Sequence, residues 1–234
     1  MVFYHFCWDL GEFGVLDSAT VNSGGWRLFA QVIGSSFLFI SGLSFWLFWI
    51  YSKNFKRFLL RLAKLFIASI LVTLGSFVAY GEYFIFFGIL HLLTVCTLLA
   101  ILLVRLPVLL LFTLSILVAF VTNYLLFEVF ESRLYYWVGL YSGDIGTVDF
   151  YPFFPWAAPY IFGLAFGKIL YKYPSRHKGN IEIVNNDTNN RKQNNLILNG
   201  AKKGLMLLSS YALSIYLIHQ PVLFGIIILA LKLI

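Results

Sequence analysis

Six apolar segments of this chain are each long enough to cross a membrane, and they constrain the fold more than any motif does. A helix needs about 20 apolar residues to span the hydrocarbon core, and only helices or closed barrels satisfy their backbone there. Hydrophobic residues make up 60% of the 234 residues and charged residues 12%, whereas soluble domains are about half apolar and a quarter charged. The sequence therefore predicts an all-α, polytopic transmembrane bundle with spans at 27–51, 58–79, 83–104, 107–128, 151–171 and 204–231.

The distribution of charge gives this bundle an orientation. If the chain crosses the membrane alternately from residue 27, the loops at 52–57, 105–106 and 172–203, with the adjoining helix ends, hold 14 of the 17 Lys and Arg residues. The opposite side holds 8 of the 10 Asp and Glu residues. Because cytoplasmic loops carry the excess of Lys and Arg, the first side is predicted to be cytoplasmic. The net charge of +7 is thus explained by topology and membrane lipid, and no nucleic-acid partner is expected.

This orientation places residues 9–25 and 129–150 outside the cytoplasm and the Asn-rich linker 173–203 inside it. The whole chain, 1–234, is predicted to be one integral-membrane domain of a prokaryotic cytoplasmic membrane. The linker is too polar to contribute to a core. Cys7 and Cys96 both lie in apolar segments, so each is expected to be a buried, reduced thiol.

The opening residues MVFYHFCWDL are apolar but too few to cross a membrane. Residues 1–8 cover about 12 Å of helix, against a core of about 30 Å. They lack the basic start and cleavage site of a signal peptide. We expect them to form the outer end of a first helix whose inner part lies upstream; a short half-helix that never spans is the alternative.

Three histidines fall at membrane depth, where polar side chains are costly and often functional. His5 and Asp9 are four residues apart, so a helix places them on one face, and Asp9 could orient the imidazole of a base. The alternative is an interfacial histidine beside a loop carboxylate. His91 is as easily explained by a hydrogen bond between helices as by a site. His219 lies beside Tyr216, Gln220 and Pro221, which breaks the helix ladder; this polar patch favours a site.

Further candidates lie toward the two membrane surfaces. On the outer side, Asn22, Arg27 and Trp156 could contact a ligand, although an aromatic belt and an ion pair with Asp17 explain them equally. On the inner side, positive-inside topology and anionic lipid account for a basic stretch, with binding of a donor's phosphates as the alternative. No P-loop, Rossmann fingerprint, GxSxG, CxxC pair or HExxH occurs, so no metal is expected. The basic residues concerned are Lys53, Lys56, Arg57 and Arg61.

The order of several short motifs resembles a known family. They are MVFYHFCWDL, SFLFISGLSFWLF, RFLLRLAK, FGILHLL, PFFPWAAPYIFGLAFGK and YALSIYLIHQPV. In this order they look like the bacterial and archaeal relatives of the heparan-alpha-glucosaminide N-acetyltransferase catalytic domain, within the wider transmembrane acyltransferase superfamily. The resemblance covers nearly the whole chain except the linker. In that family the first helix normally begins upstream of the histidine that His5 matches.

The resemblance implies a catalytic role for His5, with Asp9 as its partner. It also implies that acetyl-CoA, or another acyl-CoA, donates from the cytoplasmic side to an amino sugar or other envelope carbohydrate on the opposite face. Acyl transfer requires a base or nucleophile and donors for the developing oxyanion. His91, His219, Tyr216 and Gln220 are the candidate donors.

Two other functions remain open at the level of sequence. A small membrane transporter or proton-coupled carrier would use His91 and His219 as relay residues and would consume no CoA. A structural membrane subunit would tolerate replacement of all three membrane histidines. The sequence leaves a homodimer open and does not identify the acceptor or the acyl chain.

Overall fold

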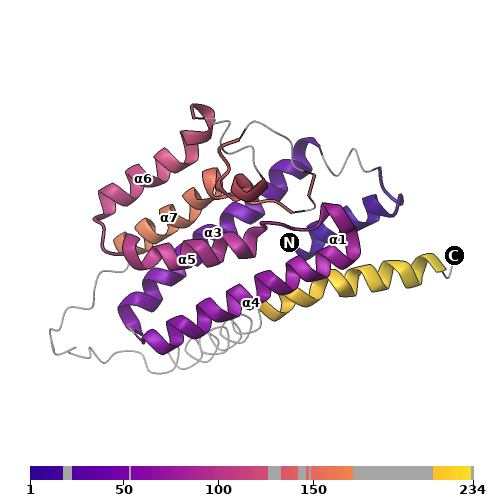
Figure 1. Cartoon of the computed structure of the whole chain (residues 1–234), viewed down its shortest axis with the longest axis horizontal. Coiled ribbons are helices and arrows are strands. Elements are labelled where there is room, and N and C mark those ends of the chain that lie inside the picture. Colours follow the sequence, from indigo (N-terminus) through magenta and orange to yellow (C-terminus); the bar gives the residue numbers. More distant parts are fainter. Residues whose placement is uncertain are drawn as a thin grey trace, which may run out of the picture. The chain divides into compact units, whose positions relative to one another are not determined.

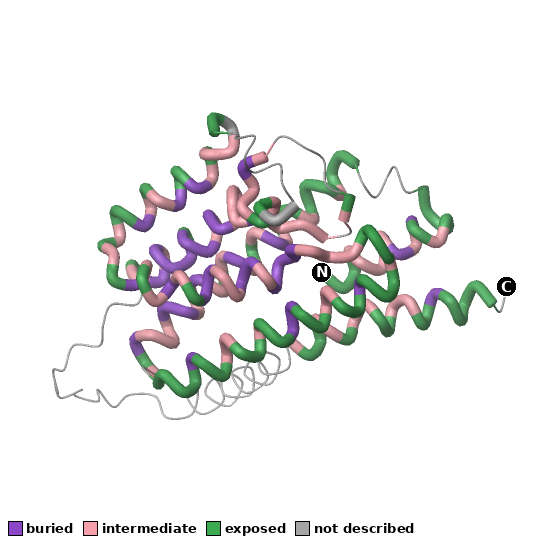
Figure 2. Tube along the Cα trace, in the orientation of Figure 1, coloured by how far each residue is buried: buried purple, intermediate pink, exposed green. Residues whose placement is uncertain are grey.

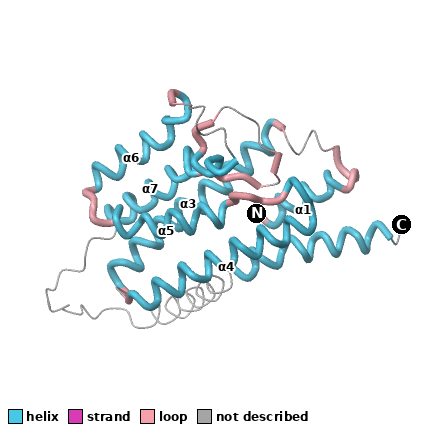
Figure 3. The backbone as a smooth tube through the Cα atoms, viewed as in Figure 1, coloured by secondary structure: helices cyan, strands magenta, loops and turns pink. Residues whose placement is uncertain are grey.

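The computed structural model describes residues 1–17, 23–52, 54–125, 133–141, 146–147, 149–170 and 213–232. Every regular element in these ranges is helical (Figures 1 and 3), which confirms the predicted all-α class. The chain divides into two compact units. Residues 1–24 and 175–234 form the first unit, and residues 25–174 form the second. The predicted linker, 173–203, lies outside the described residues.

Within the described ranges, four helices are long and apolar enough to cross a membrane. They are α3 (Gly24–Tyr51), α4 with the adjoining 3-10 turn (Phe55–Tyr83), α7 (Phe153–Leu170) and the C-terminal helix (Leu213–Lys232). The other two predicted spans also contain apolar helices, α5 (Ile89–Leu103) and α6 (Val108–Phe120), which are 15 and 13 residues long. The chain is therefore an integral membrane protein, and its described part holds four helices of spanning length and two shorter apolar ones.

Capping residues mark where two of these helices begin. Asn54 caps α4, because its Oδ1 accepts from the backbone N–H of Lys56 at 3.0 Å and of Arg57 at 3.3 Å; the helix thus starts three residues before the predicted position. The predicted span at 83–104 starts late, at Ile89. Gly81 ends α4 with a positive φ of 57°, and Gly88 then caps α5 in an extended conformation.

Small residues allow close packing inside the second unit. A Cβ on Gly42 of α3 would meet the backbone carbonyl oxygen of Tyr160 in α7, and a Cβ on Gly163 of α7 would meet that of Phe39. Glycines at such crossings let two membrane helices approach at backbone distance. On α6, the Ser115 hydroxyl donates to the carbonyl of Ala158 in α7 at 2.9 Å. The buried residues concentrate on α5 and α7, while α4 is largely exposed (Figure 2).

One lysine holds the end of the second unit at which α5 is followed by α6. Lys168, in the last turn of α7, donates to the carbonyl oxygens of Val104 at 3.0 Å and Leu106 at 2.6 Å. These carbonyls follow the end of α5, where no helical N–H is available to them. The Lys168 ammonium also lies 5.1 Å from the centre of the Trp46 ring. Lys168 thereby links α3, α7 and the α5–α6 turn.

The first unit contains α1 (Val2–Glu12) and the C-terminal helix. The Phe13 and Phe224 rings meet edge to face, with centroids 5.2 Å apart. Cys7 is buried on α1 and is a free thiol, as is Cys96 in the second unit; this confirms the prediction of two reduced, buried cysteines. Helix α1 is the element that carries His5 and Asp9.

Candidate functional site

The first unit brings together five of the candidate side chains. His5 and Asp9 come from α1, and Tyr216, His219 and Gln220 come from the C-terminal helix. The His5 and His219 rings have centroids 5.1 Å apart. Gln220 Nε2 donates to Asp9 Oδ1 at 2.7 Å across 211 residues of sequence. We call these five residues the two-histidine cluster.

The partner of Asp9 differs from the one that the sequence suggests. Asp9 lies one helical turn from His5, yet its hydrogen bond in the described residues is with Gln220. The His5 ring is half-buried and contacts the Tyr4 ring at 5.7 Å as well as that of His219. The carboxylate of Asp9 therefore joins the two helices of the unit, and a neighbouring imidazole, rather than a carboxylate, lies beside His5.

The orientation of His219 is fixed by its own helix. Its Nδ1 lies 2.6 Å from the backbone carbonyl oxygen of Tyr216. A carbonyl can only accept, so Nδ1 carries the proton. In the neutral ring Nε2 then has a free lone pair, and this atom is buried without a hydrogen-bond partner. Asp9 Oδ2 and Gln220 Oε1 are likewise buried and unpartnered.

His91 belongs to the second unit, where both ring nitrogens have partners. Its Nδ1 accepts from the backbone N–H of Gly88 at 3.2 Å, so its proton lies on Nε2, 3.1 Å from Thr73 Oγ1. The Thr73 hydroxyl in turn donates to the carbonyl of Ile85 at 3.0 Å. This chain of bonds caps α5 and joins it to α4. A structural role thus accounts for every hydrogen bond that His91 makes.

Asp149 is not among the candidates from the sequence. It belongs to the loop before α7, and its side chain lies beside the first residue of α5. Its Oδ2 is 3.4 Å from the backbone N–H of Ile89 and occupies the space that a Cβ on Gly88 would need. Two further bonds attach the same loop, from Thr147 Oγ1 to the Phe84 carbonyl at 2.8 Å and from the Tyr151 N–H to the Phe87 carbonyl at 3.0 Å. Burial raises the pKa of Asp149 to about 6, and the bond from Ile89 opposes this shift only in part.

This raised pKa predicts a pH-dependent stability. Between pH 4 and 6 the folded protein binds the proton and the unfolded chain does not, so the contribution of Asp149 to stability grows as the pH falls through 6. We expect Asp149→Asn to be more stable than the wild type at pH 7.5 by about 1–2 kcal/mol, since one pKa unit is about 1.4 kcal/mol and the side chain is partly exposed. Thermal melts at pH 7.5 and 5 measure this. The difference should shrink at pH 5; an equal or reversed difference would contradict the assignment.

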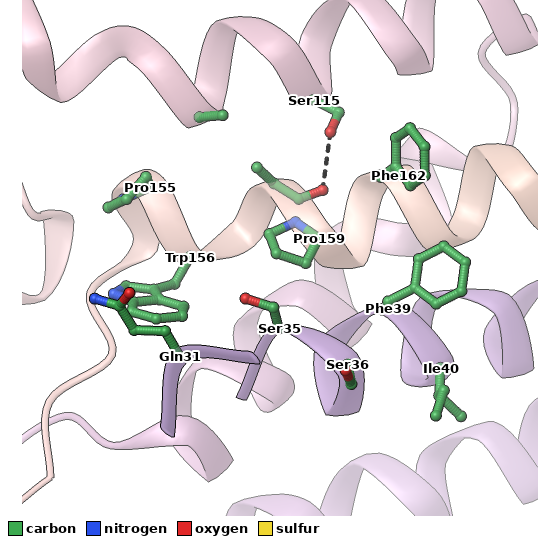
Figure 4. Close-up of a pocket in the computed structure, with 12 residues that line it drawn as sticks. Gln31, Ser35, Ser36, Phe39, Ile40, Ser115, Pro155, Trp156, Pro159 and Phe162 are labelled. Carbon is green, nitrogen blue, oxygen red and sulfur yellow. Dashed lines mark hydrogen bonds between the residues drawn. The ribbon is translucent and has the colours of Figure 1, made fainter. Parts of the chain in front are cut away.

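The candidates that the sequence predicted on the outer side lie outside the two-histidine cluster. Arg27 is exposed on α3, and Asn22 lies outside the described residues. Trp156 meets the Tyr151 ring edge-on at 4.6 Å and lines a pocket of about 870 Å³ between α3, α6 and α7. Figure 4 shows the Gln31 amide beside the Trp156 ring, with Ser35 and Ser36 further along α3. The pocket is mostly apolar, and the polar side chains in its lining are Gln31, three serines and the indole N–H of Trp156.

The basic candidates lie at the start of α4. Lys56 and Arg57 are exposed in its first turn, and Arg61 is half-buried one turn later. Lys53 lies outside the described residues. In the part of the chain that the structure describes, no group of three His, Cys, Asp or Glu side chains is placed to hold a metal ion.

Comparison with known proteins gives one match. A family model described as "Heparan-alpha-glucosaminide N-acetyltransferase, catalytic" matches residues 1–221. The matched range includes all five residues of the two-histidine cluster, from both ends of the chain. No curated protein and no solved structure is similar enough to match the chain.

Proposed function

The chain belongs to the heparan-alpha-glucosaminide N-acetyltransferase catalytic family, and from this premise we propose that it transfers an acetyl or related acyl group from cytosolic acyl-CoA to an extracytoplasmic carbohydrate. Membership implies a membrane-embedded acetyltransferase. The finer proposal is that acetyl-CoA is the donor and that an amino sugar, or another envelope carbohydrate with a free amine or hydroxyl, is the acceptor.

The two-histidine cluster is the observation that carries this proposal. Acyl transfer needs a group that deprotonates the acceptor or carries the acyl group, and an imidazole can do either. Two imidazoles 5.1 Å apart, with a buried carboxylate on the same helix as one of them, supply such groups. His91 has no comparable free atom, because both of its nitrogens serve the α5 cap.

The donor would bind from the cytoplasmic side. Lys53, Lys56, Arg57 and Arg61 belong to the basic stretch that the charge distribution places there, and cations at the start of α4 are suited to the phosphates of CoA. A carbohydrate reaching the cluster from outside would complete the reaction without crossing the membrane.

His5→Ala tests this function. The protein, reconstituted in liposomes, is given acetyl-CoA and glucosamine, and the N-acetylated product is measured by mass spectrometry. We expect the wild type to form product and His5→Ala to lose about 100-fold or more of its rate, the usual scale for removing an imidazole from a reacting centre. His177→Ala, which changes the predicted linker histidine, serves as a control and should retain full activity.

The outcomes separate the parts of the proposal. A wild type that forms no product with glucosamine or with hydroxyl acceptors would overturn the acyltransferase assignment. A wild type that transfers acetyl groups together with an unimpaired His5→Ala variant would leave the function and overturn the role of His5.

A further inference from the structure

Three buried side-chain atoms of the two-histidine cluster have no hydrogen-bond partner among the described residues, and all three are acceptors. They are Asp9 Oδ2, His219 Nε2 and Gln220 Oε1, and each is buried. Buried polar atoms in proteins nearly always have a hydrogen-bond partner. Because Asp9 as a carboxylate only accepts, the Gln220 amide nitrogen must face it, and the amide oxygen is the atom left over. The cluster thus has three free acceptors, and a group that satisfies them must donate hydrogen bonds.

The tautomer of His219 leaves no N–H of the neutral ring free to stabilise an oxyanion. Its single N–H in the neutral state is used by the Tyr216 carbonyl at 2.6 Å. This is how a base is oriented when a backbone oxygen replaces the carboxylate of a catalytic triad. The bond holds the ring in place and directs the lone pair of Nε2 away from its own helix turn. It also stabilises the imidazolium that forms when Nε2 takes up a proton.

We propose that His219 Nε2 is the proton acceptor of the reaction, and that Asp9 Oδ2 and Gln220 Oε1 bind the other two hydrogens of the acceptor's ammonium group. This inference rests on the proposed acyl transfer and removes from His5 only the role of base. It makes the cluster the binding site of the nucleophile.

The step balances as follows for an amine acceptor. The amine nitrogen attacks the thioester carbonyl, so a C–N bond forms and the C–S bond breaks. His219 Nε2 first takes one proton from the ammonium group, which frees the nitrogen lone pair for this attack, and the second proton that leaves nitrogen passes to the departing CoA sulfur. The products are the amide, the free CoA thiol and one proton, which the imidazolium of His219 releases to water.

A tautomer measurement tests the geometry without relying on activity. In ¹⁵N-histidine-labelled protein in nanodiscs, the ring signals of His219 are assigned by their loss in His219→Gln and, independently, in His219→Asn. We expect a protonated Nδ1 and an unprotonated Nε2 at pH 7.5, and a shift of the Nε2 signal when glucosamine is added. A protonated Nε2 with a free Nδ1, or a signal that glucosamine does not move, would overturn the proposal.

The kinetic test compares His219→Gln with His5→Gln, a matched pair in which each variant loses one imidazole. We expect His219→Gln to lose about 100-fold in transfer at pH 7 while the Kd of acetyl-CoA changes less than about threefold. The loss should shrink at least tenfold as the pH rises through the pKa of the acceptor amine, because the acceptor then arrives already deprotonated.

A recovery of the transfer rate at high pH in His5→Gln instead of His219→Gln would overturn the assignment of His219 as the base. Absence of transfer by the wild type would overturn the function, and the tautomer measurement would still decide the geometry.

Discussion

Gly163→Ala is expected to destabilise the second unit by about 3 kcal/mol, the upper end of the usual cost of overpacking. The added methyl group would meet the backbone carbonyl of Phe39 in α3. A flexible side chain could move aside, but a helix backbone cannot move without shifting the whole of α3. Gly42→Ala should have a similar effect, since its methyl group would meet the Tyr160 carbonyl from the other helix. Melting temperatures of the detergent-purified variants, followed by fluorescence-detected gel filtration, measure the loss.

Gly75→Ala is the matched control. Gly75 lies in the interior of α4, and nothing is within 4 Å of a Cβ built on it. Alanine also favours helix over glycine by about 1 kcal/mol. This variant should therefore melt at the wild-type temperature or above it. Equal melting temperatures for all three alanine variants would show that α3 and α7 do not cross at Gly42 and Gly163.

The apolar pattern predicted the helices because lipid demands long, continuous runs, but it could not locate every end. The run from Tyr83 to Val104 is mostly apolar, and nothing in its hydropathy marks Ile89 as the first residue of α5. That start depends on the bond from the Gly88 N–H to the His91 ring and on Asp149, which is 60 residues away from Ile89. A cap made by a distant loop is a tertiary contact, and a local pattern does not contain it.

The same limit applies to the candidate site. His5, Asp9, His219 and Gln220 could each be selected from the sequence, because polar side chains at membrane depth are rare. Helical spacing then suggested Asp9 as the partner of His5, whereas the structure pairs Asp9 with Gln220. The four-residue spacing determines only which side chains share a face. Which of them form a hydrogen bond depends on the side chains of the neighbouring helix. Here that helix supplies the Gln220 amide, whose N–H donates to the carboxylate oxygen of Asp9.

The bond between Asp9 and Gln220 predicts an unusual order of stability among three variants. Gln220→Leu leaves the Asp9 carboxylate buried without a partner, which should cost about 3 kcal/mol. Asp9→Leu leaves only a neutral amide unpaired, so about 1–2 kcal/mol is expected. The double variant removes both polar groups and replaces them with apolar side chains of similar size. It should be more stable than Gln220→Leu alone, although it carries one more substitution.

Cys7 provides the measurement, because it is buried on α1 at 8% exposure, two residues from Asp9. Its labelling rate with a membrane-permeant maleimide reports the opening of α1, and Cys96, at 2% exposure in the second unit, is the internal control. A cost of 3 kcal/mol corresponds to about a 100-fold faster reaction at Cys7 in Gln220→Leu, since 1.4 kcal/mol is a factor of about ten. The double variant should react more slowly than Gln220→Leu, with Cys96 unchanged in all three. Faster labelling in the double variant than in Gln220→Leu would mean that Asp9 does not depend on Gln220, because removing an unpaired buried carboxylate can only relieve the strain on α1.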